Sequence, residues 1–295
     1  MGAADAVPGV SGGTIAFITG IYEELIYSLK QCSVSALKVL FSSGLKAAWQ
    51  HINGSFLVAL FGGILISILT VSRVVLFLLD NHPILLWSFF FGLILAAVWS
   101  VIRHIEKWKV SILVAFLSGV VSAFYVTTIT PTTIETSNTI VFLSGMIAIC
   151  AMILPGISGS FILLLLGMYA PMLTAVKELQ YITLSIFAAG CVTGLLSFSH
   201  VLNWMFTHFK TMTLALLGGF MLGSLNKVWP WKQTLETMID RHGKEIPVVQ
   251  NNILPHTFEN IHSQPSQLWY AITFMLLGLI MVVVLEKVGQ QANSD

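Results

Sequence analysis

Charged side chains are scarce in this sequence, and their scarcity excludes most soluble folds. They make up 9% of the 295 residues, whereas soluble domains carry roughly 25%, and 56% of the residues are hydrophobic. So few charges cannot coat a water-exposed surface, and we therefore expect an integral membrane protein. The formal net charge is only +1, which gives no indication of nucleic acid as a partner.

Cysteine is also rare. Cys32, Cys150 and Cys191 are scattered, mostly inside apolar runs, so we expect small buried side chains rather than a disulfide framework or a metal centre. We predict no metal, no cofactor and no catalytic residue. The first basic residue is Lys30, so the charged start of a signal peptide is missing, and the sequence carries no Walker A motif for ATP.

Hydrophobic runs, by contrast, are long and do not alternate with polar residues, which favours helices over the alternating strands of a barrel. Helical segments are expected at about 14–29, 55–79, 83–102, 110–126, 139–154, 161–176, 181–205, 211–228 and 268–285. A polar segment at about 229–266 is predicted to be an extramembrane loop.

One motif occurs twice. The stretch "AVPGVSGGTIAFITGIY" (6–22) nearly recurs as "ILPGISGSFILLLLGMY" (153–169). A shift of 147 aligns Pro8 with Pro155, Gly9 with Gly156, Ser11 with Ser158, Gly12 with Gly159, Gly20 with Gly167, and Tyr22 with Tyr169. A shift of 127 aligns Gly63 with Gly190 and Gly92 with Gly219. We therefore predict two homologous halves, 1–126 and 127–295, an architecture common among secondary transporters.

Helix length suggests how the halves are oriented. Segment 161–176 has 16 residues and would be about 24 Å long, less than the roughly 30 Å of a bilayer's hydrocarbon core. A short helix after a Pro-Gly break is typical of a re-entrant hairpin. Three crossings would separate two such hairpins, and an odd number inverts the second half. The predicted fold is an all-α integral membrane protein, a polytopic helical bundle with two inverted repeats, each a re-entrant helical hairpin plus three spans.

Basic residues orient the predicted bundle, because cytoplasmic loops carry the excess of Lys and Arg. If both termini are cytoplasmic, eight basic residues lie on the cytoplasmic side: Lys30, Lys38, Lys46, Arg103, Lys107, Lys109, Lys210 and Lys287. Five then lie outside: Lys177, Lys227, Lys232, Arg241 and Lys244. A 16-residue apolar run precedes the second motif but only seven residues precede Pro8, so we expect the first hairpin to lack its descending arm in this sequence.

The motifs have a composition suited to binding an anion. Proline removes a backbone donor and glycine permits tightly turned backbone, so each motif is expected to break a helix inside the membrane. The helix that starts after the break turns its unpaired N–H groups and positive dipole end toward the midplane, which attracts anions. The predicted substrate-binding residues are Ser11, Gly12, Gly13, Thr14, Ser158, Gly159 and Ser160. The alternative is close helix packing through small residues.

Ionisable side chains inside the spans are few, and each is a functional candidate. Arg73 is predicted to contact the anion from a cavity; the alternatives are that it snorkels to the interface or pairs with Asp80. Four further residues are predicted to serve coupling or gating: Asp5, Glu23, Glu24 and His200.

The stretch "GAADAVPGVSGGTIAFITGIYEELI" resembles the opening signature of the PopT-type polyprenyl-phosphate transporters, and "LPGISGSFILLLLGMY" and "FFFGLILAAVW" are also similar to that family. The resemblance covers nearly the whole chain. It implies a multi-pass protein of the bacterial inner membrane that returns undecaprenyl phosphate from the outer to the cytoplasmic leaflet, for reuse in peptidoglycan and other envelope polymers. Family members usually carry a helix-forming segment before the motif, and the abrupt start here departs from that pattern. The motif positions carried over are Asp5, Pro8, Gly9, Ser11, Gly12, Gly13 and Thr14, with Glu23 and Arg73.

Two other functions stay open on the residues alone. A channel or exchanger for a small inorganic anion would also use helix N-termini at the midplane. A membrane lipid phosphatase would need a cluster of His, Asp and Arg around a nucleophile, and the sequence offers no such pattern. Besides the lipid phosphate, the expected partners are membrane lipids, and either protons or sodium ions for coupling; the oligomeric state and the chain-length preference are left open.

Overall fold

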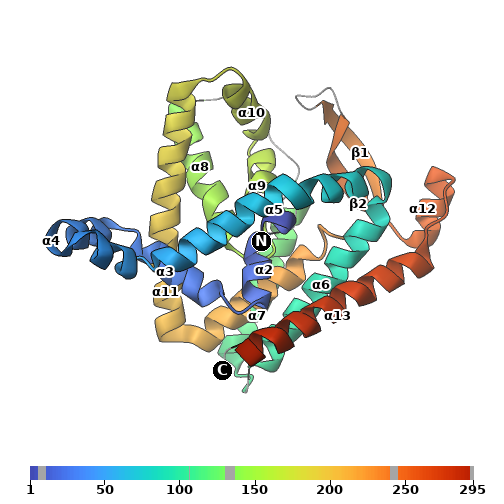
Figure 1. Cartoon of the computed structure of the whole chain (residues 1–295). Helices are drawn as coiled ribbons and strands as arrows, with labels where there is room; N and C mark the ends of the chain where they lie inside the picture. The colour runs from blue at the N-terminus through green and yellow to red at the C-terminus, as the bar shows by residue number, and fades with distance from the viewer. Residues whose placement is uncertain (6–10, 106, 130–136, 240–244, 293–295) are drawn as a thin grey trace.

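The computed structural model describes residues 1–5, 11–105, 107–129, 137–239 and 245–292 (Figure 1). In chain order the helices are α1 (Gly2–Asp5), α2 (Gly12–Ile18), α3 (Tyr22–Gln31), α4 (Val34–His51), α5 (Gly54–Asn81), α6 (Pro83–Arg103), α7 (Val110–Thr128), α8 (Asn138–Ile153), α9 (Gly159–Leu165), α10 (Tyr169–Lys177), α11 (Tyr181–Ser224), α12 (Pro255–His262) and α13 (Leu268–Ala292). Two strands, β1 (Lys232–Ile239) and β2 (Glu245–Asn252), pair as an antiparallel hairpin.

Long apolar helices dominate the described part of the chain. Five of them, α5, α6, α7, α11 and α13, are long and apolar enough to cross a membrane. A sixth candidate is the pair α9 and α10, which is bent by 109°. The predicted class, a helical protein with several membrane spans, is confirmed.

Two expected helices are each divided at a glycine. Gly20 has φ +76° and Gly167 has φ +66°, a left-handed conformation that glycine adopts without steric cost. Segment 161–176 is therefore not one helix but α9 and α10, and segment 14–29 is divided into α2 and α3 in the same way. The continuous apolar composition around each glycine concealed both turns.

Other boundaries also differ from expectation. The predicted spans 181–205 and 211–228 are one element, α11, interrupted by non-helical backbone at Phe209 (φ −137°, ψ 44°). The polar segment 229–266, expected as a loop, contains the β1–β2 hairpin and α12. In Figure 1 this hairpin lies at the upper right.

The local backbone of the two motifs repeats as their sequences do. α2 and α9 each have seven residues, and each follows a serine with extended backbone, Ser11 (φ −116°, ψ 133°) or Ser158 (φ −101°, ψ 135°). Each helix is followed closely by one of the left-handed glycines. The inversion of the halves, the two re-entrant hairpins and the division at residue 126 stay predictions.

Helix packing relies on glycines outside the motifs. A methyl group added at any of eight such glycines would clash with a carbonyl oxygen of the facing helix. These residues are Gly119, Gly219 and Gly223 between α7 and α11, Gly92 and Gly278 between α6 and α13, and Gly145, Gly190 and Gly194 between α8 and α11. Small residues that let helix backbones approach are the usual means of association in membranes. The scaffold around the motifs is thus closely packed.

The first motif lies in the protein interior. Ala16 of α2 and Tyr22 and Ile26 of α3 pack in one buried cluster with Leu202 and Leu217 of α11. Irregular backbone at membrane depth is tolerated where protein surrounds it rather than lipid. Burial of α2 and α3 therefore supplies the environment that a broken helix requires.

Candidate functional site

Ser11 begins the first motif helix and contacts the second motif. Its hydroxyl oxygen accepts a hydrogen bond from the N–H of Gly13 at 3.1 Å and so caps α2. The same oxygen lies 3.2 Å from the carbonyl oxygen of Met152 and 3.1 Å from that of Leu154, and its single proton donates to one of them at a time. The N-terminus of α2 is therefore held against the segment that leads into the second motif.

Two further hydrogen bonds join the motifs. Thr14 accepts from the backbone N–H of Gly156 at 2.9 Å, and the Tyr22 hydroxyl donates to the carbonyl of Ile153 at 3.2 Å. Both side chains are buried, with Thr14 at 0% exposure. The described parts of the two motifs, about 140 residues apart in the chain, are thus in direct contact (α2 and α9 lie near the centre of Figure 1).

These contacts also engage the hydroxyl groups that were predicted to bind substrate. Ser11 and Thr14 are both buried, and both have protein partners. In this conformation they stabilise the junction of the two motifs. Binding of an anion by these hydroxyls requires at least one of those hydrogen bonds to open.

The second motif helix starts differently. Ser158 precedes α9 but its side chain makes no capping hydrogen bond; its hydroxyl pairs instead with that of Ser160 at 2.8 Å. Gly159 packs against α8, where an added methyl group would lie 2.7 Å from the carbonyl oxygen of Ala148. One residue beyond Ser160, Phe161 leaves the motif junction and lines a separate polar pocket.

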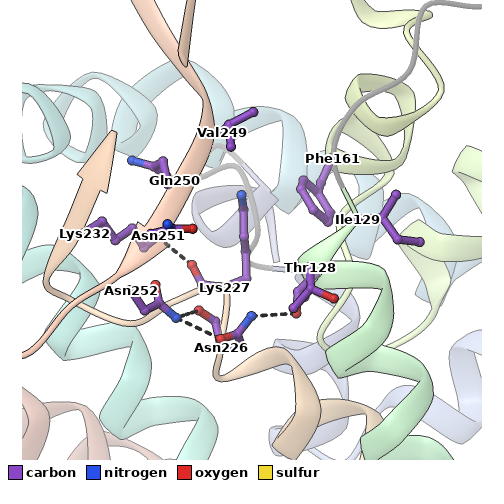
Figure 2. A pocket seen from close by; sticks show the side chains of 11 residues that line it. Thr128, Ile129, Phe161, Asn226, Lys227, Lys232, Val249, Gln250, Asn251 and Asn252 are labelled. Carbon is purple, nitrogen blue, oxygen red and sulfur yellow. Dashed lines mark hydrogen bonds between the residues drawn. The ribbon is translucent and has the colours of Figure 1, made fainter. Parts of the chain in front are cut away.

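This polar pocket, which we call the lysine pocket, has a volume of about 190 Å³. Its lining comes from four elements and includes Thr127, Thr128, Phe161, Asn226, Lys227, Lys232 and Asn252 (Figure 2). The Lys227 ammonium lies 4.4 Å from the centre of the Phe161 ring, and that of Lys232 lies 4.0 Å from the centre of the Trp87 ring. Lys232 also donates to the carbonyl of Lys227 at 2.6 Å, which ties the start of β1 to the end of α11.

The surroundings of this pocket disfavour the charged form of both lysines and so lower the pKa of each. Burial lowers the pKa of Lys227 to about 8. Burial also lowers the pKa of Lys232, and the neighbouring positive charge of Lys227 lowers it further. Among the described residues neither ammonium has a carboxylate partner. The pocket is therefore an electropositive site without an internal counter-ion.

A second pocket, the ion-pair pocket, has a volume of about 440 Å³. Its lining includes Phe17, Gly20, Tyr22 and Glu23 from the first motif and its continuation, together with Arg103, Lys210 and Glu286. Glu23 pairs with Lys210 at 2.7 Å, linking α3 to α11, and Arg103 pairs with Glu286, linking α6 to α13. Both pairs are partly exposed, so each contributes little to stability, typically about 0–1 kcal/mol.

The two pockets lie at opposite ends of α7. Arg103 and His104, shortly before this helix, line the ion-pair pocket, whereas Thr127 and Thr128 at its other end line the lysine pocket. Its 19 residues make it about 28 Å long, close to the thickness of a bilayer core. The first motif borders one pocket through Gly20 and the second borders the other through Phe161. The joined motifs therefore lie between two polar pockets.

The remaining predicted residues lie elsewhere. The side chain of Arg73 is exposed on α5 and lines neither pocket, and His200 is exposed on α11 with its ring bonded to the carbonyl of Leu196. Glu24 accepts a hydrogen bond from Asn53 at 2.7 Å. The side chain of Asp5, like the residues Pro8 and Gly9, lies outside what the structure describes. Each functional assignment stays a prediction.

Lys227 and Lys232 were not among the predicted site residues, because the sequence placed Lys227 at the end of the expected span 211–228 and Lys232 in the polar segment after it. The available signal was local: the six residues "KVWPWK" hold two cations and two tryptophans without an acid. No group of three His, Cys, Asp or Glu side chains in the described ranges is placed to hold a metal ion.

Several apolar spans, two motifs joined by hydrogen bonds and a polar pocket at either end of α7 define a helical membrane protein with several candidate spans. The chain belongs to the undecaprenyl phosphate translocase-like family, whose profile matches residues 1–246. It is therefore grouped with transporters and not with enzymes.

Two relatives extend the match. A polyprenyl-phosphate transporter of Vibrio cholerae is 52% identical over 291 residues, which cover 99% of this chain and 94% of that protein. A polyprenyl-phosphate transporter of Staphylococcus aureus is 34% identical over 249 residues, covering 78% of this chain and 83% of that protein. No solved structure gives a significant match.

Proposed function

We propose that this protein transports undecaprenyl phosphate from the outer to the cytoplasmic leaflet of the bacterial inner membrane. Family membership and the names of the two relatives support polyprenyl phosphate as the substrate class. The structural observation that carries the proposal is the pair of joined motifs between the ion-pair pocket and a pocket whose lysines have no carboxylate partner among the described residues. A lipid phosphate leaves its chain in the bilayer, so the protein has to provide a polar route only for the head group.

The charge distribution supports an orientation for this route. If cytoplasmic loops carry the excess of basic residues, the ion-pair pocket with Arg103 and Lys210 faces the cytoplasm. The lysine pocket then faces outward and receives the head group first. Both termini are cytoplasmic in this orientation. The head group passes the backbone of the two motifs, near Gly12, Gly13 and Gly159, once the hydrogen bonds between the motifs open.

Inward movement of this substrate needs an energy source. Moving one negative charge against an inside-negative potential costs about 2.3 kcal/mol per 100 mV. The sequence carries no Walker A motif, so we propose that a co-transported proton or sodium ion offsets this cost. Glu23 is the coupling candidate that lines a pocket, since it borders the ion-pair pocket and its carboxylate pairs with the exposed Lys210.

Reconstitution tests the proposal. Liposomes containing undecaprenyl phosphate receive either the wild-type protein or a Gly12→Leu variant, and an impermeant reagent reports the fraction of head groups in the outer leaflet. Wild type should equilibrate or concentrate the lipid, whereas leucine at the buried start of α2 should block transport. Gly62→Leu is the matched control, because nothing lies within 4 Å of a Cβ atom added at Gly62. A wild type that behaves as empty liposomes do would contradict the assignment.

Two further arms separate the alternatives. Inorganic phosphate trapped inside the liposomes tests the anion exchanger, which would release it without lipid. Arg73→Ala tests the predicted contact of Arg73 with the head group. Because Arg73 is exposed on α5 and lines neither pocket, unchanged transport in this variant would remove it from the route without affecting the rest of the proposal.

A further inference from the structure

Resting on the proposed function, we propose that the lysine pocket is a binding site for a phosphate monoester, with the Lys227 ammonium as the principal contact. Family membership does not assign this site, and Phe161 is the one residue of the duplicated motifs in its lining. The site lies where α9 meets the segment that follows α11 and the β1–β2 hairpin.

The first support is an unpartnered cation. The described residues offer the Lys227 ammonium no hydrogen-bond acceptor and no carboxylate; its one close contact is the face of the Phe161 ring at 4.4 Å. Figure 2 shows this side chain extending into the pocket between Phe161 and the hairpin residues Gln250 and Asn251. A partly buried charge without a partner is unfavourable, and a bound anion is the group that would compensate it.

The second support is the division of roles between the two lysines. Lys232 is already used structurally, since it donates to the Lys227 carbonyl and lies over the Trp87 ring. Burial and the charge of Lys227 both lower the pKa of Lys232, so Lys227 is the cation on which the site depends. The described part of the chain gives the Lys227 ammonium no such bond, so its donors are available to a ligand that carries several acceptor oxygens. A phosphate monoester carries three and bears about two negative charges at neutral pH.

The third support is the polar floor of the pocket. Asn226 donates to the Thr127 hydroxyl at 3.0 Å, and Asn252 donates to the carbonyl of Asn226 at 2.7 Å and to its side-chain oxygen at 2.8 Å. This network fixes the end of α11 relative to α7 and to the hairpin. The ammonium of Lys227 is thus presented from a rigid base, which lowers the entropy that is lost on binding.

Size and position favour a head group rather than a whole lipid. The volume of about 190 Å³ is several times the roughly 30 Å³ that a water molecule occupies, yet it is below the 300–1,000 Å³ typical of sites for drug-sized ligands. The apolar side chains of Phe161 and Ile129 form one wall. A phosphate would bind at the lysine, and an attached isoprenoid chain would leave past this apolar wall.

Gly156 of the second motif packs against the end of α11, close to Lys227. Gly156 has φ +92°, and a methyl group added there would lie 2.7 Å from the hydroxyl oxygen of Ser224, three residues before Lys227. The same Gly156 donates its N–H to Thr14 of the first motif. A displacement of the end of α11 on phosphate binding would therefore act on the bond that joins the two motifs.

Binding to purified protein in nanodiscs tests the site. Three probes are compared: inorganic phosphate, polyprenyl phosphate, and the matched polyprenol without phosphate. Lys227→Met keeps an unbranched stem over Phe161 but removes the charge, and it should weaken phosphate binding about 10- to 100-fold, as expected for a charge-assisted hydrogen bond. Lys177→Met, an exposed lysine at the end of α10, is the control and should bind as wild type does.

The arms distinguish the sources of the phosphate. Lys227-dependent binding of inorganic phosphate alone supports the site with a soluble anion as its ligand, and Lys227-dependent binding of polyprenyl phosphate but not polyprenol supports the lipid head group. Equal affinities of wild type and Lys227→Met for both phosphates would overturn the inference, even if transport is intact. If Lys227-dependent binding occurs but no lipid is transported, the site stands and the proposed function fails.

Discussion

Thr14 accepts a hydrogen bond from the backbone N–H of Gly156, although 142 residues separate them in the chain. A side chain of one motif thereby satisfies a backbone donor that the Pro-Gly break of the other motif leaves without a helical partner. Such a donor cannot turn to water at the centre of a membrane protein and is costly when unpaired. The break of the second motif therefore depends on a side chain of the first motif, and changes at the junction of the motifs should destabilise that break.

Replacing Thr14 by valine tests this dependence. The valine fills the same volume but leaves the Gly156 N–H buried without an acceptor, which typically costs about 1–3 kcal/mol. We expect a lower unfolding temperature in detergent and a loss of transport. Thr14→Ser keeps the hydroxyl and should retain most of both. Equal stability of the valine and serine variants would show that the hydrogen bond contributes little.

A methyl group at Gly13 tests the close approach of the motifs. The added carbon would lie 2.6 Å from the carbonyl oxygen of Ile153, so the backbones must separate, at a cost of about 1–3 kcal/mol. Gly13→Ala should therefore destabilise the protein. Gly62→Ala adds the same group within α5, where nothing lies within 4 Å, and should be neutral or slightly stabilising because alanine favours helix. Thermal unfolding of both variants measures the difference.

Sequence patterns predicted the long spans well but not the short breaks within them. Expected segments 83–102 and 110–126 agree with α6 (Pro83–Arg103) and α7 (Val110–Thr128) because uninterrupted apolar runs have few alternatives in a membrane. The turns at Gly20 and Gly167 were missed, since a single left-handed residue does not change the hydrophobicity around it. The alignment of these two glycines in the repeat was the one available sign.

The candidate site depended more on tertiary structure. The motif residues could be named from their duplication, but their mutual hydrogen bonds arise only when α2 packs against the end of α8. The lysine pocket requires β1 to fold back so that Lys232 reaches the Lys227 carbonyl and the Trp87 ring. No spacing within the sequence encodes that approach. A composition dominated by polar residues likewise concealed the hairpin.

The Glu23–Lys210 pair provides a test of coupling that is separate from stability. Both side chains are about half exposed, at 50% and 58%, so Glu23→Gln should change the free energy of unfolding by less than about 1 kcal/mol. Transport should fall, because this carboxylate lines the ion-pair pocket. Glu178→Gln removes an exposed carboxylate bonded to Gln180 and should leave transport unchanged. An unaffected transport rate in Glu23→Gln would exclude Glu23 from coupling.

Phosphate binding at the lysine pocket should depend on pH in a predictable direction. The charged form of Lys227 binds the anion, and burial lowers its pKa to about 8, so affinity should fall as the pH rises through 8. At the acidic end the phosphate monoester loses its second charge near pH 6. The expected optimum therefore lies between about pH 6 and pH 8. Titration calorimetry in buffers of different ionisation enthalpy should detect proton uptake on binding above pH 8, since the bound anion raises the pKa of Lys227.

Arginine at position 227 separates this titration from other causes of the alkaline decline. Guanidinium has a pKa above about 12 and remains charged throughout the range, so Lys227→Arg should retain affinity at pH 9–10, where wild type loses it, and should show less proton uptake. A general loss of structure at high pH would affect both proteins equally. An identical alkaline decline in wild type and Lys227→Arg would therefore contradict the role of Lys227, because the ammonium that titrates near pH 8 could not be the group that holds the phosphate.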